Sequence, residues 1–272
     1  MSGYDINSKR VGCRMEKSAL HKESIRSIKQ RLNDKLDQDT LKILEQDSRK
    51  GVQDLLTRYY RREKKQAQLK KDYQLKFKYE EAARAAGYQC IAGVDEVGRG
   101  PLAGPVVAAA VILPETCDLI GLTDSKQLSE VKRDYFYQAI QREALAIGIG
   151  IVSPEVIDEI NILEASKQAM LEAIESLELA PDYLLLDAIE LNTVIPQQSL
   201  IKGDLKSISI AAASVIAKVT RDRLMSRYDR QYPGYDFLSN QGYGTKKHIE
   251  GLKQLGVTPI HRRSFAPVRA YL

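Results

Sequence analysis

Short apolar runs after Gly87 constrain the fold of this chain more than any other feature of its sequence. Each run is five to eight residues long and is bounded by turn-forming or charged residues, as in strands buried on both faces. They predict strands at 90–95, 106–113, 147–152 and 183–187, with a short strand at 199–202. Helical spacing predicts helices at 129–146, 154–179, 207–230 and 245–255. Because strands first follow one another and then alternate with helices, we predict an α/β fold with a mixed sheet flanked by helices.

The residues before Gly87 show no strand-like run. From His21 onward, apolar residues recur at helical spacing, beginning with Ile25, Ile28 and Leu32. The residues before His21 are polar and aperiodic, which predicts disorder. We therefore predict a disordered tail at 1–20, a small helical N-terminal module at 21–87 and a second domain at 88–272.

Charge is unevenly distributed along the chain. The formal net charge of +5 conceals a basic start, an acidic middle and a basic end, with −1 on residues 91–101. Residues 1–90 carry +9, residues 102–201 carry −11 and residues 202–272 carry +8. Such segregation predicts a polyanionic partner for the basic parts and a cation for the acidic part, while solvated charged helices are the plainer alternative.

Cysteine content and hydropathy indicate the cellular compartment expected for the protein. The three cysteines, Cys13, Cys90 and Cys117, are odd in number and lack C-x-x-C spacing, which disfavours a disulfide framework and a thiolate metal site. The longest uncharged stretch, Gly100 to Pro114, is shorter than the roughly 20 residues of a membrane helix. The N-terminus lacks the apolar core of a signal peptide. We therefore expect a cytoplasmic protein that does not enter membranes.

Acidic residues stand at the ends of three predicted strands. Asp95 and Glu96 close the first strand, Asp187 closes another, and Asp204 follows the short strand at 199–202. The carboxyl ends of strands in an α/β sheet open onto the ligand crevice, so these carboxylates can converge there. An oxygen-only set suits Mg²⁺ or Mn²⁺ and suits zinc poorly. Taken singly, each aspartate can instead be a helix N-cap or a turn residue.

The glycine-rich segment that begins at these carboxylates closely resembles a known motif. Residues 95–107, DEVGRGPLAGPVV, are similar to the first motif of bacterial type 2 ribonuclease H, ribonuclease HII. Further blocks match in the same order: Asp124-Ser125-Lys126, Leu186-Asp187-Ala188, Lys202-Gly203-Asp204, Ser209 to Asp222, Gly242 to Thr245 and His261 to Phe265. The resemblance covers about residues 88–268, and the chain lacks the Glu that type 3 ribonuclease H carries where Asp204 stands.

The resemblance implies a ribonuclease H-like α/β fold and a metal-dependent endoribonuclease. Its catalytic and metal-binding residues would be Asp95, Glu96, Asp187 and Asp204, with Asp95 bridging two Mg²⁺ or Mn²⁺ ions and Glu96 acting partly through its backbone carbonyl. The expected reaction is hydrolysis of the phosphodiester 5′ of a ribonucleotide. The substrates would be RNA–DNA hybrids and duplex DNA with embedded ribonucleotides, and the products would carry 3′-hydroxyl and 5′-phosphate ends.

The same resemblance assigns substrate-binding residues. Gly98, Arg99, Gly100 and Tyr243 would read the 2′-hydroxyl and the neighbouring sugar, and Lys126 would contact a phosphate.

Other candidates come from helical spacing. Ser214, Lys218, Arg221 and Asp222 share one helix face, part of which we expect to touch the substrate strand, while an internal role for Arg221 and Asp222 is equally open. His248 and His261 are interpreted as helix-surface or capping residues outside the site.

Other functions explain less of the sequence. A glycosidase also uses paired carboxylates, but sugar sites present aromatic faces and this chain has no Trp. A non-catalytic hybrid-binding protein would leave the carboxylates without a purpose, and another metal-dependent nuclease of the ribonuclease H-like superfamily is the nearest alternative.

The N-terminal module carries no catalytic motif and resembles the extension of some longer ribonucleases HII. Its basic character and its interleaved Tyr59, Tyr60, Tyr73 and Tyr79 predict extra grip on duplex backbone, and a solvated bundle packed on the catalytic domain is the alternative. We expect a monomer without an obligatory protein partner.

Overall fold

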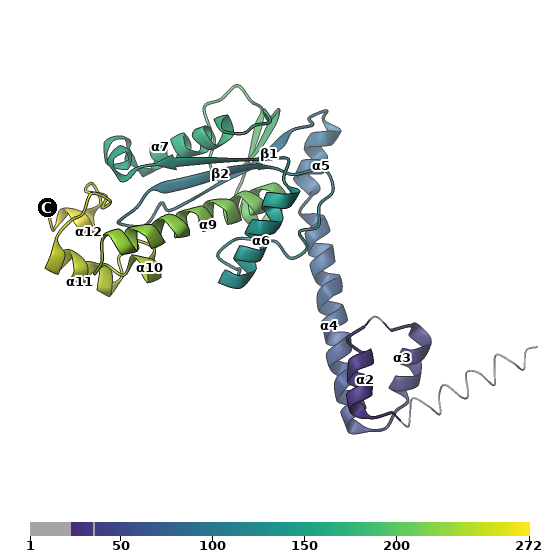
Figure 1. Cartoon of the computed structure of the whole chain (residues 1–272). Coiled ribbons are helices and arrows are strands. Elements are labelled where there is room, and N and C mark those ends of the chain that lie inside the picture. The colour runs from purple at the N-terminus through teal and green to yellow at the C-terminus, as the bar shows by residue number, and fades with distance from the viewer. Residues whose placement is uncertain (1–22, 35) are drawn as a thin grey trace, which may run out of the picture. The chain divides into compact units, whose positions relative to one another are not determined.

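The computed structural model describes residues 23–34 and 36–272, so the predicted tail at 1–20 lies outside the described residues (Figure 1). The chain divides into two compact units, Met1–Lys70 and Lys71–Leu272. None of the described helices is long and apolar enough to cross a membrane.

The first unit is helical, as the spacing of its apolar residues predicts. It contains α2 (Ile25–Arg31), α3 (Gln38–Glu45) and most of α4 (Lys50–Leu75). The Ser24 side chain caps α2, and the Asp37 carboxylate accepts two backbone N–H groups at the start of α3. Its small core consists of Ile28, Leu32, Ile43, Leu44, Val52, Leu56 and Tyr59.

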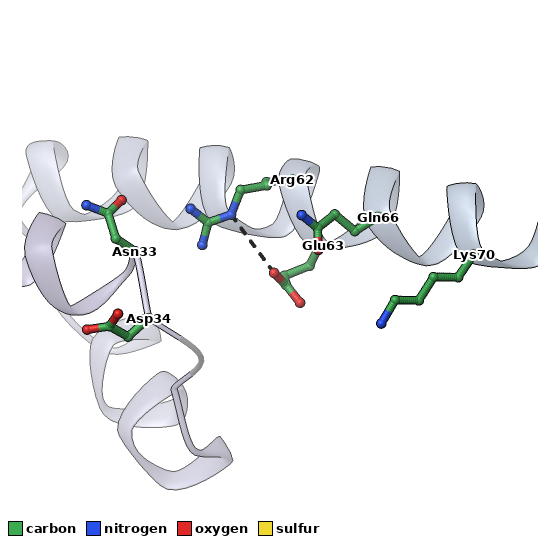
Figure 2. Close-up of a pocket in the computed structure, with 6 residues that line it drawn as sticks. All are labelled: Asn33, Asp34, Arg62, Glu63, Gln66 and Lys70. Atoms are coloured by element: carbon green, nitrogen blue, oxygen red, sulfur yellow. Dashed lines mark ion pairs between the residues drawn. The ribbon is translucent and has the colours of Figure 1, made fainter. Parts of the chain in front are cut away.

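The first unit also has a polar pocket of about 330 Å³, shown in Figure 2. Its lining combines two cations, two carboxylates and two amides: Arg62, Lys70, Asp34, Glu63, Asn33 and Gln66. The only ion pair drawn there, between Arg62 and Glu63, spans 4.0 Å and is exposed. Exposed pairs of this kind contribute little free energy, so we assign this pocket no chemistry.

The second unit is built on a five-stranded sheet. Its strands are β1 (Ile91–Val97), β2 (Val106–Ile112), β3 (Ala146–Val152), β4 (Tyr183–Asp187) and β5 (Gln197–Leu200). Their order is β3-β2-β1-β4-β5, with antiparallel pairing among the first three and parallel pairing of β1 with β4 and of β4 with β5. The predicted mixed sheet is confirmed.

Helices cover both faces of this sheet. Figure 1 shows α7 (Pro154–Glu175) on one side and α9 (Ile208–Gln231) on the other. Alternation along β2 divides its side chains between the two layers, so Ala109 packs in the α9 core and Ala108 in the α7 core. A Cβ at Gly93 would lie 2.1 Å from the backbone of Ser209, so glycine lets the start of α9 approach β1 closely.

The remaining helices of this unit are shorter. They are α5 (Lys78–Ala85), α6 (Glu130–Glu143), α8 (Gly203–Lys206), α10 (Phe237–Asn240), α11 (Lys246–Leu255) and α12 (Ala266–Arg269).

The boundary between the compact units lies before α5, whereas the sequence pattern places the domain boundary at Gly87. Side chains from the end of α4 and from α5 bond to the rest of the second unit, of which they are part. The Tyr73 hydroxyl donates to the Cys117 carbonyl, and the Lys76 ammonium donates to the Leu205 carbonyl at 2.8 Å. The buried Glu80 carboxylate accepts hydrogen bonds from Ser207 and Ser209. Helical periodicity does not reveal which core a helix contacts, and these bonds place residues 71–85 with the sheet.

Candidate active site

Three carboxylates converge at the carboxyl ends of β1, β4 and β5. One oxygen from each of Asp95, Asp187 and Asp204 lies within 4.8 Å of the others. The sheet register explains the first two, because Val94 pairs with Leu186 in the parallel β1–β4 ladder and the next residues are Asp95 and Asp187. The carboxyl ends of these parallel strands thus bring the acidic side chains together.

Asp204 joins the group from the turn after β5. Lys202 adopts a left-handed conformation with φ of 56°, which turns the chain into α8. The Gly203 backbone N–H then donates to Oδ1 of Asp187 at 2.6 Å. This bond fixes the start of α8, and therefore Asp204, against the end of β4.

Glu96 lies beside this group without belonging to it. β1 continues through Val97, so the Asp95 and Glu96 side chains leave the strand on opposite sides. Burial and the charge of Asp187 nevertheless raise the pKa of Glu96, so its carboxylate still lies close to the group. The Glu96 backbone N–H donates to Oδ1 of Asp95 at 2.8 Å, and its carboxylate pairs with Arg99 at 3.4 Å. Its other oxygen, Oε2, is buried without a hydrogen-bond partner among the described residues. A buried carboxylate oxygen without a partner is costly, and a bound cation would satisfy it.

The carboxylates raise each other's pKa values. Burial, followed by the charges of Glu96 and Asp187, raises the pKa of Asp95 well above its ordinary value. Burial and the neighbouring Asp187 raise the pKa of Asp204 to about 6, and burial also raises the pKa of Asp187. Such concentrated negative charge is stable in the ionised form only with a neutralising cation. The oxygen-only donor set fits a hard divalent ion such as Mg²⁺ or Mn²⁺.

Two buried arginines hold the glycine loop that follows β1. Arg221 is 1% exposed and donates to the carbonyls of Pro105, Gln241 and Ala103 at 2.9–3.1 Å. Arg262 is 0% exposed and donates to the carbonyls of Gly104, Arg99 and Gly98. Burial lowers the pKa of Arg221 to about 10 and that of Arg262 to about 9. Five loop carbonyls are therefore bonded to these two buried guanidinium groups, and the Gln241 carbonyl accepts a sixth bond.

These contacts settle the open interpretation of Arg221. Its partners are the loop carbonyls of Pro105 and Ala103 and the Gln241 carbonyl, whereas Asp222 pairs with Lys218 at 2.5 Å and with Arg133 at 3.5 Å. Arg262 belongs to the matched block from His261 to Phe265. No local pattern indicates its role, because its partners lie more than 150 residues earlier in the chain.

Two predicted readers of the ribonucleotide lie together. A Cβ at Gly100 would be 3.3 Å from Cε1 of Tyr243, so the loop backbone and the tyrosine ring are neighbours. The Tyr243 side chain is half exposed, and Arg99 is exposed beside Glu96. Gly98 has a φ of 97°, which only glycine adopts readily.

The predicted phosphate contacts differ in their surroundings. The Lys126 charge lowers the pKa values of Asp187 and Asp204, which places it near the carboxylates. Ser214 is buried, bonds to the Ser125 hydroxyl at 3.0 Å and lowers the pKa of Asp95 through a hydrogen bond. Lys126 is thus exposed near the site, while Ser214 and Lys218 already have protein partners.

The surface interpretation of the two histidines is wrong. His248 and His261 are 0% and 1% exposed, and their Nε2 atoms lie 2.9 Å apart. The rings of His261, Tyr235 and Phe237 pack on His248, and the spacing of α11 alone does not show this.

Comparisons with known proteins give the same picture. The family model described as Ribonuclease HII matches residues 92–268, and the model described as Ribonuclease HII N-terminal domain matches residues 24–84. Curated ribonucleases HII from Enterococcus faecalis and Bacillus subtilis are 57% and 55% identical to this chain. Each alignment covers 91% of this chain and 98% of the relative.

Solved structures show the same fold. The ribonuclease H2 of Pyrococcus horikoshii matches with a TM-score of 0.58 at 28% identity, covering 67% of this chain and 97% of that one. A ribonuclease HII solved in complex with PCNA from Archaeoglobus fulgidus gives a TM-score of 0.54 at 30% identity, covering 64% and 94%. A type 3 enzyme, Bst-RNase HIII with Mn²⁺, gives 0.53 at 17% identity, covering 69% and 70%, and supports the fold alone.

The ribonuclease H-like sheet and its convergent carboxylates define a metal-dependent endoribonuclease. More particularly, the chain belongs to the ribonuclease HII family. The expected absence of an obligatory protein partner stays a prediction, since the archaeal relative was solved with PCNA.

Proposed function

We propose that this enzyme hydrolyses the phosphodiester on the 5′ side of ribonucleotides. The substrates are RNA–DNA hybrids and duplex DNA with embedded ribonucleotides, and the products carry 3′-hydroxyl and 5′-phosphate ends. The observation that carries this proposal is the convergence of Asp95, Asp187 and Asp204 within 4.8 Å, next in the chain to a loop held by two buried arginines.

Four carboxylates form the proposed metal site. Asp95, Asp187 and Asp204 offer one converging oxygen each, and the unpartnered Oε2 of Glu96 offers a fourth acceptor. Two Mg²⁺ or Mn²⁺ ions bound there would lower the pKa of the attacking water and stabilise the leaving 3′ oxygen. Asp95 is the most buried of the three converging carboxylates and is the residue proposed to hold both ions.

Selection of RNA requires a group that senses the 2′-hydroxyl. The backbone of Gly98, Arg99 and Gly100 is the proposed reader, because Arg262 holds the carbonyls of the first two in one orientation before substrate arrives. A loop fixed in advance loses little entropy on binding. The exposed ring of Tyr243, beside Gly100, is proposed to lie against the neighbouring sugar.

A phosphate contact completes the proposed site. Lys126 is exposed and its charge acts on Asp187 and Asp204, which favours it as the principal phosphate ligand. Ser214 and Lys218 are proposed to support the substrate strand from α9, after exchanging their present partners Ser125 and Asp222.

The direct test is cleavage of a DNA duplex that contains one ribonucleotide. We expect cutting 5′ of the ribonucleotide with Mg²⁺ or Mn²⁺, no cutting in EDTA, and no cutting of the matched all-DNA duplex. Product ends are read by ligation and phosphatase sensitivity. Metal-dependent cutting of the all-DNA duplex at the same rate would instead favour a general nuclease of the same superfamily.

A further inference from the structure

Two buried histidines form a hydrogen-bonded pair behind the proposed reader tyrosine. His248 lies on α11 and His261 lies after it, with the ring centroids 5.2 Å apart. The rings of Tyr235 and Phe237 pack against both imidazoles. Among the described residues, the hydrogen bonds and ring contacts of the two imidazoles involve only uncharged groups. Burial lowers the pKa of His261 to about 4 and also lowers that of His248, so both rings are neutral at pH 7.

The two ends of the pair determine where its protons lie. At one end, the Thr258 backbone N–H donates to Nδ1 of His261 at 3.0 Å, so this nitrogen is an acceptor. At the other end, Nδ1 of His248 lies 2.9 Å from the Tyr243 carbonyl oxygen, which can only accept. Neutral His248 therefore carries its proton on Nδ1 and neutral His261 carries its proton on Nε2. The 2.9 Å contact between the Nε2 atoms is thus a hydrogen bond that His261 donates to His248. The bonds therefore run in one direction, from Thr258 through His261 and His248 to Tyr243.

This chain of bonds ends at a residue with few other restraints on its side chain. The Tyr243 ring is half exposed and borders Gly100, which has no side chain to hold it. Its backbone carbonyl accepts from the Thr245 N–H at 2.7 Å as well as from His248. His261 also pairs with Ala103 in an isolated bridge of the glycine loop. The histidine pair thus connects the backbone of Tyr243 with the loop that Tyr243 faces.

We propose that His248 and His261 are positioning residues that fix the Tyr243 backbone and so aim its ring at the sugar beside the ribonucleotide. The proposal rests on the proposed function, in which Tyr243 contacts that sugar. Neither histidine touches the reacting atoms. Their effect on cleavage must therefore pass through the Tyr243 side chain, which distinguishes positioning from a general structural role.

A double-variant cycle tests this dependence on a duplex with one ribonucleotide. We expect His248→Ala to lower kcat/KM about tenfold, since a misplaced contact group commonly costs one to two orders of magnitude. In a Tyr243→Ala background, the same change should cost less than about twofold, because the group it positions is gone. Losses that multiply in the double variant would overturn the proposal.

Tyr235→Phe is the matched control for damage to the same cluster. It keeps the ring that packs on both histidines and removes the buried hydrogen bond from its hydroxyl to the Gly256 carbonyl. We expect a lower melting temperature with unchanged kcat/KM. A loss of kcat/KM equal to that of His248→Ala would make the effect one of stability and would overturn the positioning role.

Imidazole nitrogen NMR of the unaltered protein gives a test that needs no variant. The expected tautomers at pH 7 are Nδ1–H for His248 and Nε2–H for His261, and the reverse tautomers or a charged ring would overturn the proposal. The two proposals fail separately. An unaltered protein that does not cut the ribonucleotide duplex refutes the proposed function, whereas one that cuts it while His248→Ala keeps full kcat/KM refutes only the positioning role.

Discussion

Two parts of the proposed site are held in place by different means: the metal corner, formed by Asp95, Asp187 and Asp204, and the recognition loop, from Gly98 to Pro105. Asp95 and Asp187 extend from strands, and the register of the parallel β1–β4 ladder brings them together. The loop from Gly98 to Pro105 has few ladder bonds and is held by the side chains of Arg221 and Arg262. Backbone pairing therefore positions two of the carboxylates, while long polar side chains position the loop that is proposed to select the substrate. Asp204 joins the carboxylates from the turn into α8.

The largest expected effect is on the metal corner. Asp95→Asn should lower cleavage by at least about a thousandfold, because it removes a charged ligand from a site where metal ions supply several kcal/mol of transition-state stabilisation. Binding of a ribonucleotide duplex, measured by fluorescence anisotropy, should stay within a few fold of the unaltered protein. Loss of binding by a folded variant would mean that the corner and the loop do not act separately.

The next effect is on the recognition loop. Arg262→Met should leave the carbonyls of Gly98, Arg99 and Gly104 without their buried donor and lower the free energy of unfolding by about 3 kcal/mol. Urea unfolding measures this change. The preference for ribonucleotide-containing over all-DNA duplex should fall at the same time, while the metal requirement of the remaining activity persists. Full preference in a folded variant would separate Arg262 from selectivity.

In metal-free protein, a fall in pH should change the stability contributions of His261 and Asp204 in opposite directions. The pKa of His261 is about 4 when folded against 6.5 in the reference state, so its contribution is full above pH 6.5 and is lost as pH falls toward 4. The pKa of Asp204 is raised from 3.8 to about 6, so its stabilising contribution is full below pH 3.8 and is lost as pH rises through 6.

Urea unfolding in EDTA between pH 4 and pH 7 measures this difference. Relative to the unaltered protein, His261→Gln should gain stability as pH falls, by roughly 2–3 kcal/mol over the window at about 1.4 kcal/mol per pKa unit. Asp204→Asn should show the opposite trend, with a smaller change. Parallel pH profiles for all three proteins would contradict the assignment of both groups.

The smallest expected effect comes from the helical first unit. A chain that begins at Lys71 retains Tyr73, Lys76 and Glu80, whose side chains bond to other parts of the second unit. It should therefore keep its rate of cleavage at saturating substrate. Its affinity for duplex should fall several fold with a flatter salt dependence, because the lost residues are rich in Lys and Arg. Unchanged affinity would favour the solvated-bundle interpretation. A chain that begins at Gly87 is the informative contrast, since it lacks those bonds and should be less stable.

The sequence predicted the metal corner better than the loop. Acidic residues at the ends of apolar strands are visible from periodicity, and parallel strands place such ends together. The position of Glu96 was harder to foresee, because β1 continues past the predicted end at Asp95, so the Glu96 side chain leaves the strand opposite Asp95 and pairs with Arg99.

The features that sequence periodicity did not predict depend on tertiary contacts. Arg262 and His261 act on residues that lie far earlier in the chain, and no local pattern records which carbonyl or ring they will meet. Nor does helical spacing show that Lys76 and Glu80 turn toward the sheet. The resemblance to ribonuclease HII placed these segments in named motifs, yet only the folded chain shows their partners.

The reach of Arg262 has a consequence for biosynthesis. The glycine loop is translated more than 160 residues before Arg262, whose side chain fixes the carbonyls of Gly98 and Arg99. Domains fold as the chain emerges from the ribosome, N-terminal segments first. A nascent chain can therefore assemble the β1–β2 hairpin before its recognition loop is locked. The proposed selectivity for ribonucleotides would therefore arise late in synthesis, once the segment that carries Arg262 has emerged and met the loop.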